Sequence, residues 1–338
     1  MFCALNGATR TPCLASHRHR PAARTLLPAS DEVPATRRAP FTGPRVAPSL
    51  RGGASRGGWR PPGRRRRLRP ALTARGPVTR WDDGRVLDDL AAIGPFFAVS
   101  SHPPQAAPAA PWRPAGELAV PSGALLGRVA SVRAALAASG GRAACEVEPR
   151  VAASAVHLGL VARLIAPALG AAVLRCPLDV RPAGLWWQDQ LGGPVPLSVP
   201  APACGPPPGQ AGGPGREPLP GEWERLLLDD TVAPVTAAVA GLVPVSSRVL
   251  WGNVASAVNA AAAQVARQRP DLAGEAWQAA RRLFASERLR TERDAPGPAF
   301  RRSSCCLFYR LVPSSQQAQG NPSALCGDCV LAGRGSLR

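Results

Sequence analysis

Residues 149–174 read PRVAASAVHLGLVARLIAPALGAAVL and form the longest apolar stretch of this 338-residue chain. The apolar side chains recur at helical spacing, at Val156, Leu160 and Leu164. Pro149 suits the first turn of a helix because its missing N–H would have no partner there. We therefore predict a core helix from about Pro149 towards Gly170. Polar residues and a proline interrupt the stretch, which argues against a membrane span.

Helices are also predicted on both sides of this stretch, because apolar residues keep a helical period there. They cover about 86–93, 122–139, 223–228, 232–242, 254–265 and 272–290, with Ser122 as a candidate N-cap. Short apolar segments bounded by Gly and Pro predict strands at 173–180, 184–188 and 195–199. The expected fold class is α+β, predominantly α-helical, with a small antiparallel sheet or hairpin and a C-terminal segment that carries four cysteines.

Charge and composition divide the chain into three parts. All 41 basic residues are Arg, and residues 1–80 hold 17 of them against two acids, a net charge of +15 within the total of +19. We predict a disordered Arg/Pro/Gly-rich tail at 1–80, either a solvated tail or a start site assigned too early. An α-rich substrate-binding domain follows at 81–300, with a Pro/Gly-rich loop at 201–221. Residues 301–338 form the C-terminal segment.

Four of the nine cysteines gather in that last segment. Cys305 and Cys306 are adjacent, and Cys326 and Cys329 follow after a 19-residue spacer. Four thiolates complete the ligand set of Zn²⁺ or of an iron–sulfur cluster. Side chains of adjacent residues point apart, so one tetrahedral ion would strain the first pair, whereas a two-iron cluster offers separated metal positions. This geometry favours the cluster and leaves zinc, or a redox disulfide, as alternatives.

The cysteine segment is similar to a known family. Residues 300–311 (FRRSSCCLFYRL) and 325–331 (LCGDCVL) resemble the C-terminal cluster motif of FhuF-type ferric-siderophore reductases. Weaker similarity extends over about residues 82–332, through 94–97 (GPFF), 148–151 (EPRV) and 251–253 (WGN). The spacer between the cysteine pairs is longer than is common in that family, which leaves the relative position of the pairs open.

The resemblance implies a [2Fe-2S] cluster held by Cys305, Cys306, Cys326 and Cys329. It also implies an oxidoreductase of iron homeostasis that reduces the Fe(III) of a cytoplasmic ferric siderophore to Fe(II) and releases the iron. The sequence carries no Gly-rich nucleotide fingerprint in a strand-to-helix context, so a separate ferredoxin or flavoprotein donor is expected. An export signal and a membrane span are not expected, and a nucleic-acid partner is disfavoured.

Two further groups of residues are candidates for binding. Aromatic rings stack on bulky ligands and amides donate hydrogen bonds to them, so the candidate substrate-binding residues are Trp186, Trp187, Trp251 and Asn253. Basic residues beside the first cysteine pair would raise a cluster's potential or dock an acidic electron donor; these are Arg301, Arg302 and Arg310. The rival functions are a zinc-stabilised protein with a basic nucleic-acid-binding tail and a non-catalytic iron–sulfur electron carrier.

Overall fold

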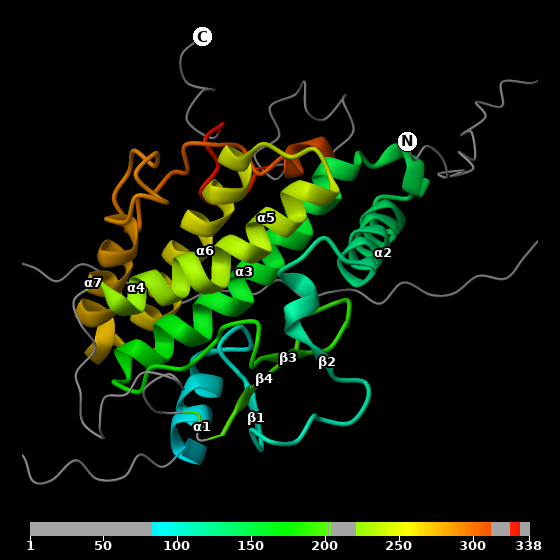
Figure 1. Cartoon of the computed structure of the whole chain (residues 1–338). Helices are drawn as coiled ribbons and strands as arrows, with labels where there is room; N and C mark the ends of the chain where they lie inside the picture. Colours follow the sequence, from blue (N-terminus) through cyan, green and yellow to red (C-terminus); the bar gives the residue numbers. More distant parts are fainter. Residues whose placement is uncertain (1–82, 202, 204–220, 312–324, 332–338) are drawn as a thin grey trace, which may run out of the picture. The chain divides into compact units, whose positions relative to one another are not determined.

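The computed structural model describes residues 83–201, 203, 221–311 and 325–331 (Figure 1), all within one compact unit that spans residues 79–338. The predicted tail at 1–80 and most of the predicted loop at 201–221 lie outside the described residues. The helices are α1 (Asp83–Ile93), α2 (Gly123–Ser139), α3 (Pro149–Val173), α4 (Glu222–Leu227), α5 (Ala233–Leu242), α6 (Ser247–Gln268) and α7 (Ala273–Phe284). The predicted α+β class with mostly helical structure is confirmed.

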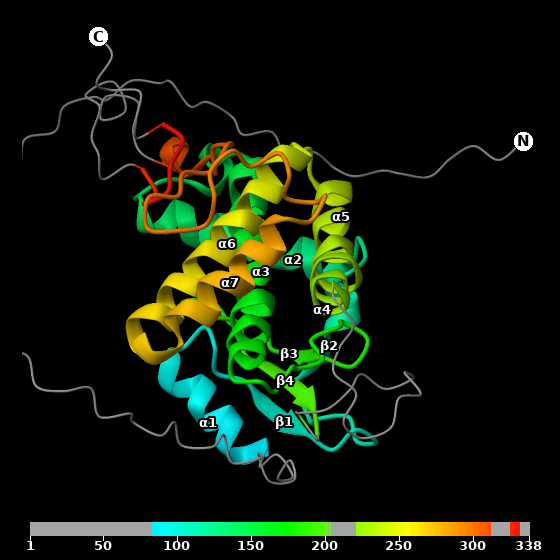
Figure 2. The ribbon, with the colours of Figure 1, turned by 90° about the vertical axis from the view of Figure 1, so that its left-hand side faces the viewer.

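Helix α3 is the central element of the fold. It packs against α6 along much of its length and also contacts α2, α5 and α7 (Figures 1 and 2). By length and composition α3 would suffice to cross a membrane, but 78% of its most apolar window is buried inside the structure. That burial is what a core helix requires. The helix continues to Val173, beyond the predicted end at Gly170. The strand predicted at 173–180 is wrong, because Val173 is helical and the residues after it form a turn and a loop.

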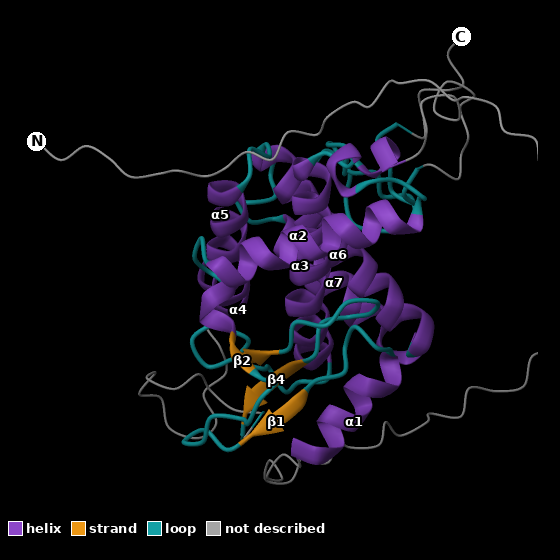
Figure 3. Cartoon of the chain, turned by 90° about the vertical axis from the view of Figure 1, so that its right-hand side faces the viewer, coloured by secondary structure: helices purple, strands orange, loops and turns teal. Residues whose placement is uncertain are grey.

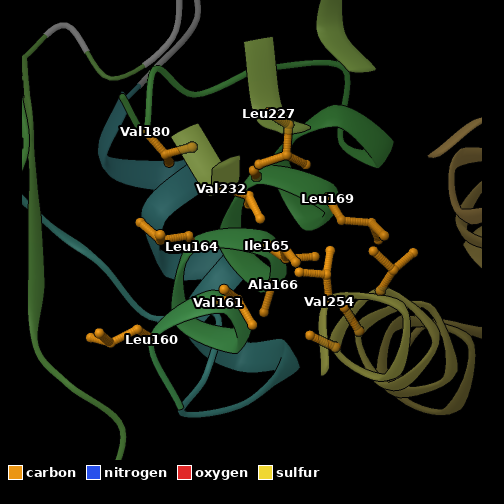
Figure 4. Packing of buried hydrophobic residues seen from close by; sticks show 14 of the residues in the cluster. Leu160, Val161, Leu164, Ile165, Ala166, Leu169, Val180, Leu227, Val232 and Val254 are labelled. Carbon is orange, nitrogen blue, oxygen red and sulfur yellow. The ribbon is translucent and has the colours of Figure 1, made fainter. Parts of the chain in front are cut away.

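Helix α3 is buried on more than one side. Figure 4 shows the side chain of Ile165 towards Val254 of α6, whereas Leu160 and Leu164 lie on the other side of α3, and each of these side chains is at most 4% exposed. A leucine buried to this degree stabilises the folded state by about 2 kcal/mol through removal of apolar surface from water. Residues 163–171 are all buried, so this part of α3 is enclosed by the rest of the fold.

Four short strands cover the end of α3 that lies away from the cysteines (Figure 3): β1 (Ser100–His102), β2 (Arg113–Pro114), β3 (Trp186–Trp187) and β4 (Leu197–Pro200). Their order in the sheet is β1-β4-β3-β2. The pair β3–β4, from the strands predicted at 184–188 and 195–199, is antiparallel, in line with the predicted antiparallel sheet. The pair β2–β3 is also antiparallel, whereas β1 and β4 are parallel, so the sheet is mixed. No strand was predicted at β1 or β2.

The side chains of Ser122 and Arg163 form hydrogen bonds that hold α2 and α3 in place. Ser122 caps α2, its Oγ accepting a hydrogen bond from the N–H of Leu125 at 3.1 Å, as predicted. Arg163 of α3 is buried and donates to the carbonyls of Phe96, Ala98 and Val195, which ties the sheet region to the helix. Burial lowers the pKa of Arg163 to about 10, so it remains a cation that the carbonyl dipoles solvate.

Candidate metal centre

The four C-terminal cysteines lie on two loops that meet near the N-terminal end of α3, above the bundle in Figures 1 and 2. The Sγ atoms of Cys306 and Cys326 are 3.4 Å apart. Cys326 and Cys329 form a tight turn in which the N–H of Cys329 donates to the carbonyl of Cys326 at 3.1 Å. Residues 312–324, most of the spacer, lie outside the described residues, and the two cysteine pairs meet in spite of its length.

The residues just before the first cysteine pair hold the second loop in place. The backbone N–H of Arg302 donates to the carbonyl of Asp328 at 3.1 Å, and the guanidinium of Arg301 donates to the carbonyl of Gly327 at 3.2 Å. Both carbonyls lie between Cys326 and Cys329. The position of the second pair is therefore set by direct contact with residues 301–302.

The backbone turns sharply directly after the adjacent cysteines. Leu307 has a φ of +72°, in the left-handed region that costs a residue with a side chain on the order of 1–3 kcal/mol. Its side chain packs against a small apolar group, formed by Ala137, Val147 and Val151, which offsets that cost. The turn also aims the N–H of Leu307 at the Sγ of Cys305, at 3.3 Å. In the second loop the N–H of Leu331 donates in the same way to Cys329, at 3.4 Å.

Mutual hydrogen bonds shift the pKa values of three of the thiols in opposite directions. Hydrogen bonds from the thiols of Cys305 and Cys326, with smaller contributions from the N–H of Phe308 and the charge of Arg302, lower the pKa of Cys306 against the effect of burial. The same hydrogen bonds, together with burial, raise the pKa of Cys305 and of Cys326. A metal that binds must displace the protons of its neighbours.

The residues at this place fit a thiolate-bound metal group in type and number. Two sulfurs bound at about 2.3 Å to one tetrahedral metal are about 3.8 Å apart, close to the observed separation of Cys306 and Cys326. In the present geometry the described residues contain no group of three or more His, Cys, Asp or Glu that could hold a metal ion, so the sulfurs would have to move to bind either a single ion or a cluster. Two buried donors, Arg302 Nε and Ser304 Oγ, have no hydrogen-bond partner among the described residues. Sulfur acceptors of a bound group are suitable partners for such donors.

A chain of buried hydrogen bonds connects the cysteines to the helical core. Arg302 is 1% exposed, and its Nη2 donates to Asn253 Oδ1 on α6 at 2.6 Å. Asn253 Nδ2 donates to the carbonyl and the Oγ of Ser154 on α3, both at 3.1 Å. The hydroxyl of Ser154 in turn donates to the carbonyl of Cys306 at 2.9 Å. We call Arg302, Asn253 and Ser154 the buried tether.

Gly252 makes room for the cysteine segment on α6. A Cβ at this position would overlap Ser304 Oγ, and it would lie 3.2 Å from Arg302 Nη2, which is closer than most Cβ contacts. Gly252 and Asn253 belong to the stretch 251–253 noted for its weak family resemblance. The structure gives that stretch a physical role: the glycine admits residues 302–304 against the helix, and the asparagine bonds them.

The predicted substrate-binding residues are not brought together. Trp187 is 0% exposed, and its Nε1 donates to Glu117 at 2.8 Å, while Trp186 is half-buried in the sheet. Figures 1 and 2 place this sheet at the opposite end of α3 from the cysteines. Asn253 is fully buried in the tether and cannot touch a ligand that stays outside. Trp251 alone lies near the site, half-buried, with the guanidinium of Arg288 at 5.4 Å from its ring centroid.

The three arginines predicted to dock an electron donor have different environments. Arg302 is buried, so it is not part of any docking surface, which corrects that prediction. Arg310 is half-buried, donates to Glu148 at 2.6 Å and lies against Tyr309. Arg301 is exposed and faces solvent beside the Cys326–Cys329 turn. The sequence pattern could not separate these cases, because all three are charged residues next to the same motif.

Two other cysteines are described, and neither belongs to this site. Cys145 is a free, exposed thiol. Cys176 is buried and disulfide-bonded, although the sequence suggested only a small buried apolar residue. The predicted metal ligands therefore remain Cys305, Cys306, Cys326 and Cys329.

Buried His157 makes stability depend on pH. Its Nε2 lies 3.0 Å from Thr236 Oγ1, and burial, with a smaller effect of the charge of Arg302, lowers its pKa from 6.5 to about 3. Below pH 6.5 the unfolded chain binds a proton that the folded chain rejects. The free energy of unfolding is therefore expected to fall as the pH drops from about 6.5 to 3, by up to about 1.4 kcal/mol per pH unit from this group.

Urea unfolding at pH 7.5 and pH 5.0 measures this effect, with His157→Gln as the comparison. Glutamine can bond to Thr236 and does not titrate, so the variant should lose less stability between the two pH values than the wild type. An equal loss in both proteins would show that His157 is not the group responsible.

Comparison with known proteins yields no further assignment: no family model, no curated protein and no solved structure matches this chain.

Proposed function

We propose that this chain is an iron–sulfur reductase that holds a [2Fe-2S] cluster on Cys305, Cys306, Cys326 and Cys329 and reduces the iron of a ferric siderophore. The observation that carries the proposal is the meeting of two cysteine pairs, with Cys306 and Cys326 at 3.4 Å, on loops whose backbone N–H groups donate to sulfur. N–H donors and a buried cation are the surroundings that stabilise thiolates of a cluster. The resemblance of residues 300–311 and 325–331 to ferric-siderophore reductases supports the same reading.

Two of the four cysteines are buried and two are partly exposed, an arrangement that suits electron transfer to a substrate at the protein surface. Cys306 and Cys329 are each 2% exposed, whereas Cys305 and Cys326 are half-buried. When bound, the cluster would supply the uptake and release of one electron. The chain's contribution is to exclude water from one side of the site and leave the other side within reach of a substrate that does not enter a deep pocket.

The chemistry of siderophores explains why an electron is enough. Hydroxamate and catecholate groups surround Fe(III) with hard oxygen ligands, and reduction to the softer Fe(II) weakens that binding. The step transfers one electron from the protein to the chelated iron, and no covalent bond to the protein forms. A separate ferredoxin or flavoprotein would restore the electron, and the cytoplasm is the proposed compartment. Exposed Arg301 is suited to an acidic donor.

The test is a single-turnover reaction. Anaerobic protein, reduced with dithionite and freed of excess reductant, is mixed with a ferric trihydroxamate or a ferric tris-catecholate in the presence of a ferrous-specific indicator. We expect one Fe(II) to appear for each electron that the protein loses. If the reduced protein keeps its electron in the presence of both chelates but passes it to an oxidised ferredoxin, the chain is a carrier and the reductase proposal is wrong.

A further inference from the structure

Arg302 is a buried cation with no acidic side chain in contact. Within the described part of the chain its guanidinium bonds Asn253 Oδ1 at 2.6 Å and the carbonyl of Val249 at 3.4 Å, and it takes part in no ion pair. Removing a charge from water costs several kcal/mol unless an opposite charge or strong hydrogen bonds replace the solvent. One neutral amide and one carbonyl are modest compensation for a guanidinium that is 1% exposed.

Hydrogen bonds connect Arg302 to both cysteine pairs. Its own backbone N–H is bonded within the Cys326–Cys329 turn, and its side chain reaches Cys306 through Asn253 and Ser154 of the buried tether. The residue is thus tied to both cysteine pairs and to the helical core at once.

We propose that Arg302 is the counter-charge and positioning residue of the cysteine centre: it fixes the two pairs on α6 and favours the form of the centre that carries one more negative charge. This inference rests on the proposed cluster. Reduction adds an electron to a group of thiolates and sulfides, and a buried cation stabilises that added charge more than an exposed one because water does not screen it. Arg310, paired with Glu148 and half-exposed, should have little such influence.

The experiment is an EPR-monitored redox titration of the reconstituted full chain, compared among variants. Arg302→Gln removes the charge, whereas Arg302→Lys keeps it. Asn253→Asp leaves the arginine in place and sets a carboxylate against it, which neutralises the charge. The substitution also removes the amide donor to the carbonyl and hydroxyl of Ser154, so its potential is compared with that of the wild type only at equal cluster content and equal thermal stability. Arg310→Gln is the matched control, since it removes an arginine from the same loop at a half-exposed position.

We expect Arg302→Gln and Asn253→Asp each to lower the equilibrium constant for reduction at least tenfold, a fall of about 59 mV in midpoint potential for one electron. Arg302→Lys should keep an equilibrium constant for reduction close to that of the wild type. Arg310→Gln should change this constant less than twofold. If Arg302→Gln does not fold, Asn253→Asp tests whether the charge of Arg302 favours the reduced form of the centre.

If the equilibrium constant for reduction of Asn253→Asp stays within twofold of the wild-type value, at unchanged cluster content, the inference is overturned and the proposed function still stands. Failure of a normally titrating wild-type protein to reduce either ferric chelate would instead refute the reductase and leave the role of Arg302 intact. Wild-type protein that takes up no cluster would refute both.

Discussion

Cys329→Ser is expected to abolish both the visible absorption of the reconstituted protein and its reduction of ferric chelates. Cys329 is 2% exposed, and its sulfur accepts the N–H of Leu331, so no other thiol can take its place without a rearrangement of the turn. Serine offers a hard oxygen where iron–sulfur clusters use thiolates. Visible spectra and ferrous release, measured on the same preparations, give the result.

Cys145→Ser is the matched control, because Cys145 is a free thiol on the surface outside the site. It should keep full colour and full turnover. Retention of activity in Cys329→Ser, at a thermal stability similar to that of the wild type, would remove this residue from the ligand set and with it the assignment of the second cysteine pair.

Gly252→Ala is expected to disrupt the cysteine centre from the helix side. The added Cβ would overlap Ser304 Oγ and crowd Ser304 Cβ and Arg302 Nη2. We expect residues 302–304 to shift away from α6, which would weaken the bond between Arg302 and Asn253. Overpacking of this kind costs about 1–3 kcal/mol. We expect the free energy of unfolding to fall by that amount and cluster occupancy after reconstitution to drop severalfold.

Two other glycines separate a local effect from a general one. A Cβ added at Gly159, on α3, would have no atom of another residue within 4 Å, so Gly159→Ala should be neutral or stabilise by up to about 1 kcal/mol. Gly170, near the other end of α3, would place a Cβ 2.8 Å from Leu90. Gly170→Ala should therefore reduce stability while the folded protein keeps its cluster. If Gly252→Ala loads as much cluster as Gly159→Ala, the close approach of residues 302–304 to α6 is not needed.

The helical core follows from the sequence because its apolar residues keep one period over long stretches. The run at 149–174 and the cap at Ser122 both specify local structure that later packing does not overrule. The strands are harder to predict. β1 has only three residues, and its parallel pairing with β4 depends on contacts across nearly a hundred positions in the chain. At Val173 the helix of the preceding run continues into the predicted strand.

The sequence predicts the candidate metal ligands, but it does not predict which residues hold them in place. Cysteine spacing identifies four sulfurs, whereas burial of a single arginine among many depends on the tertiary fold, so Arg302 looked like its exposed neighbour Arg301. Trp187 was predicted to bind substrate but is buried in the core, because aromatic side chains are suited to a core as well as to a binding pocket. One signal was available for α6: Gly252 lies inside a helical pattern, where a glycine costs about 1 kcal/mol relative to alanine.

The amounts of iron, acid-labile sulfide and zinc in anaerobically purified full-length protein, measured with its visible and EPR spectra, test the central claim most directly. We predict two irons and two sulfides per chain, a red-brown colour that bleaches with dithionite and an EPR signal of the reduced protein. A colourless protein that holds one zinc and no labile sulfide, even after reconstitution with ferrous salt and sulfide, would contradict the account.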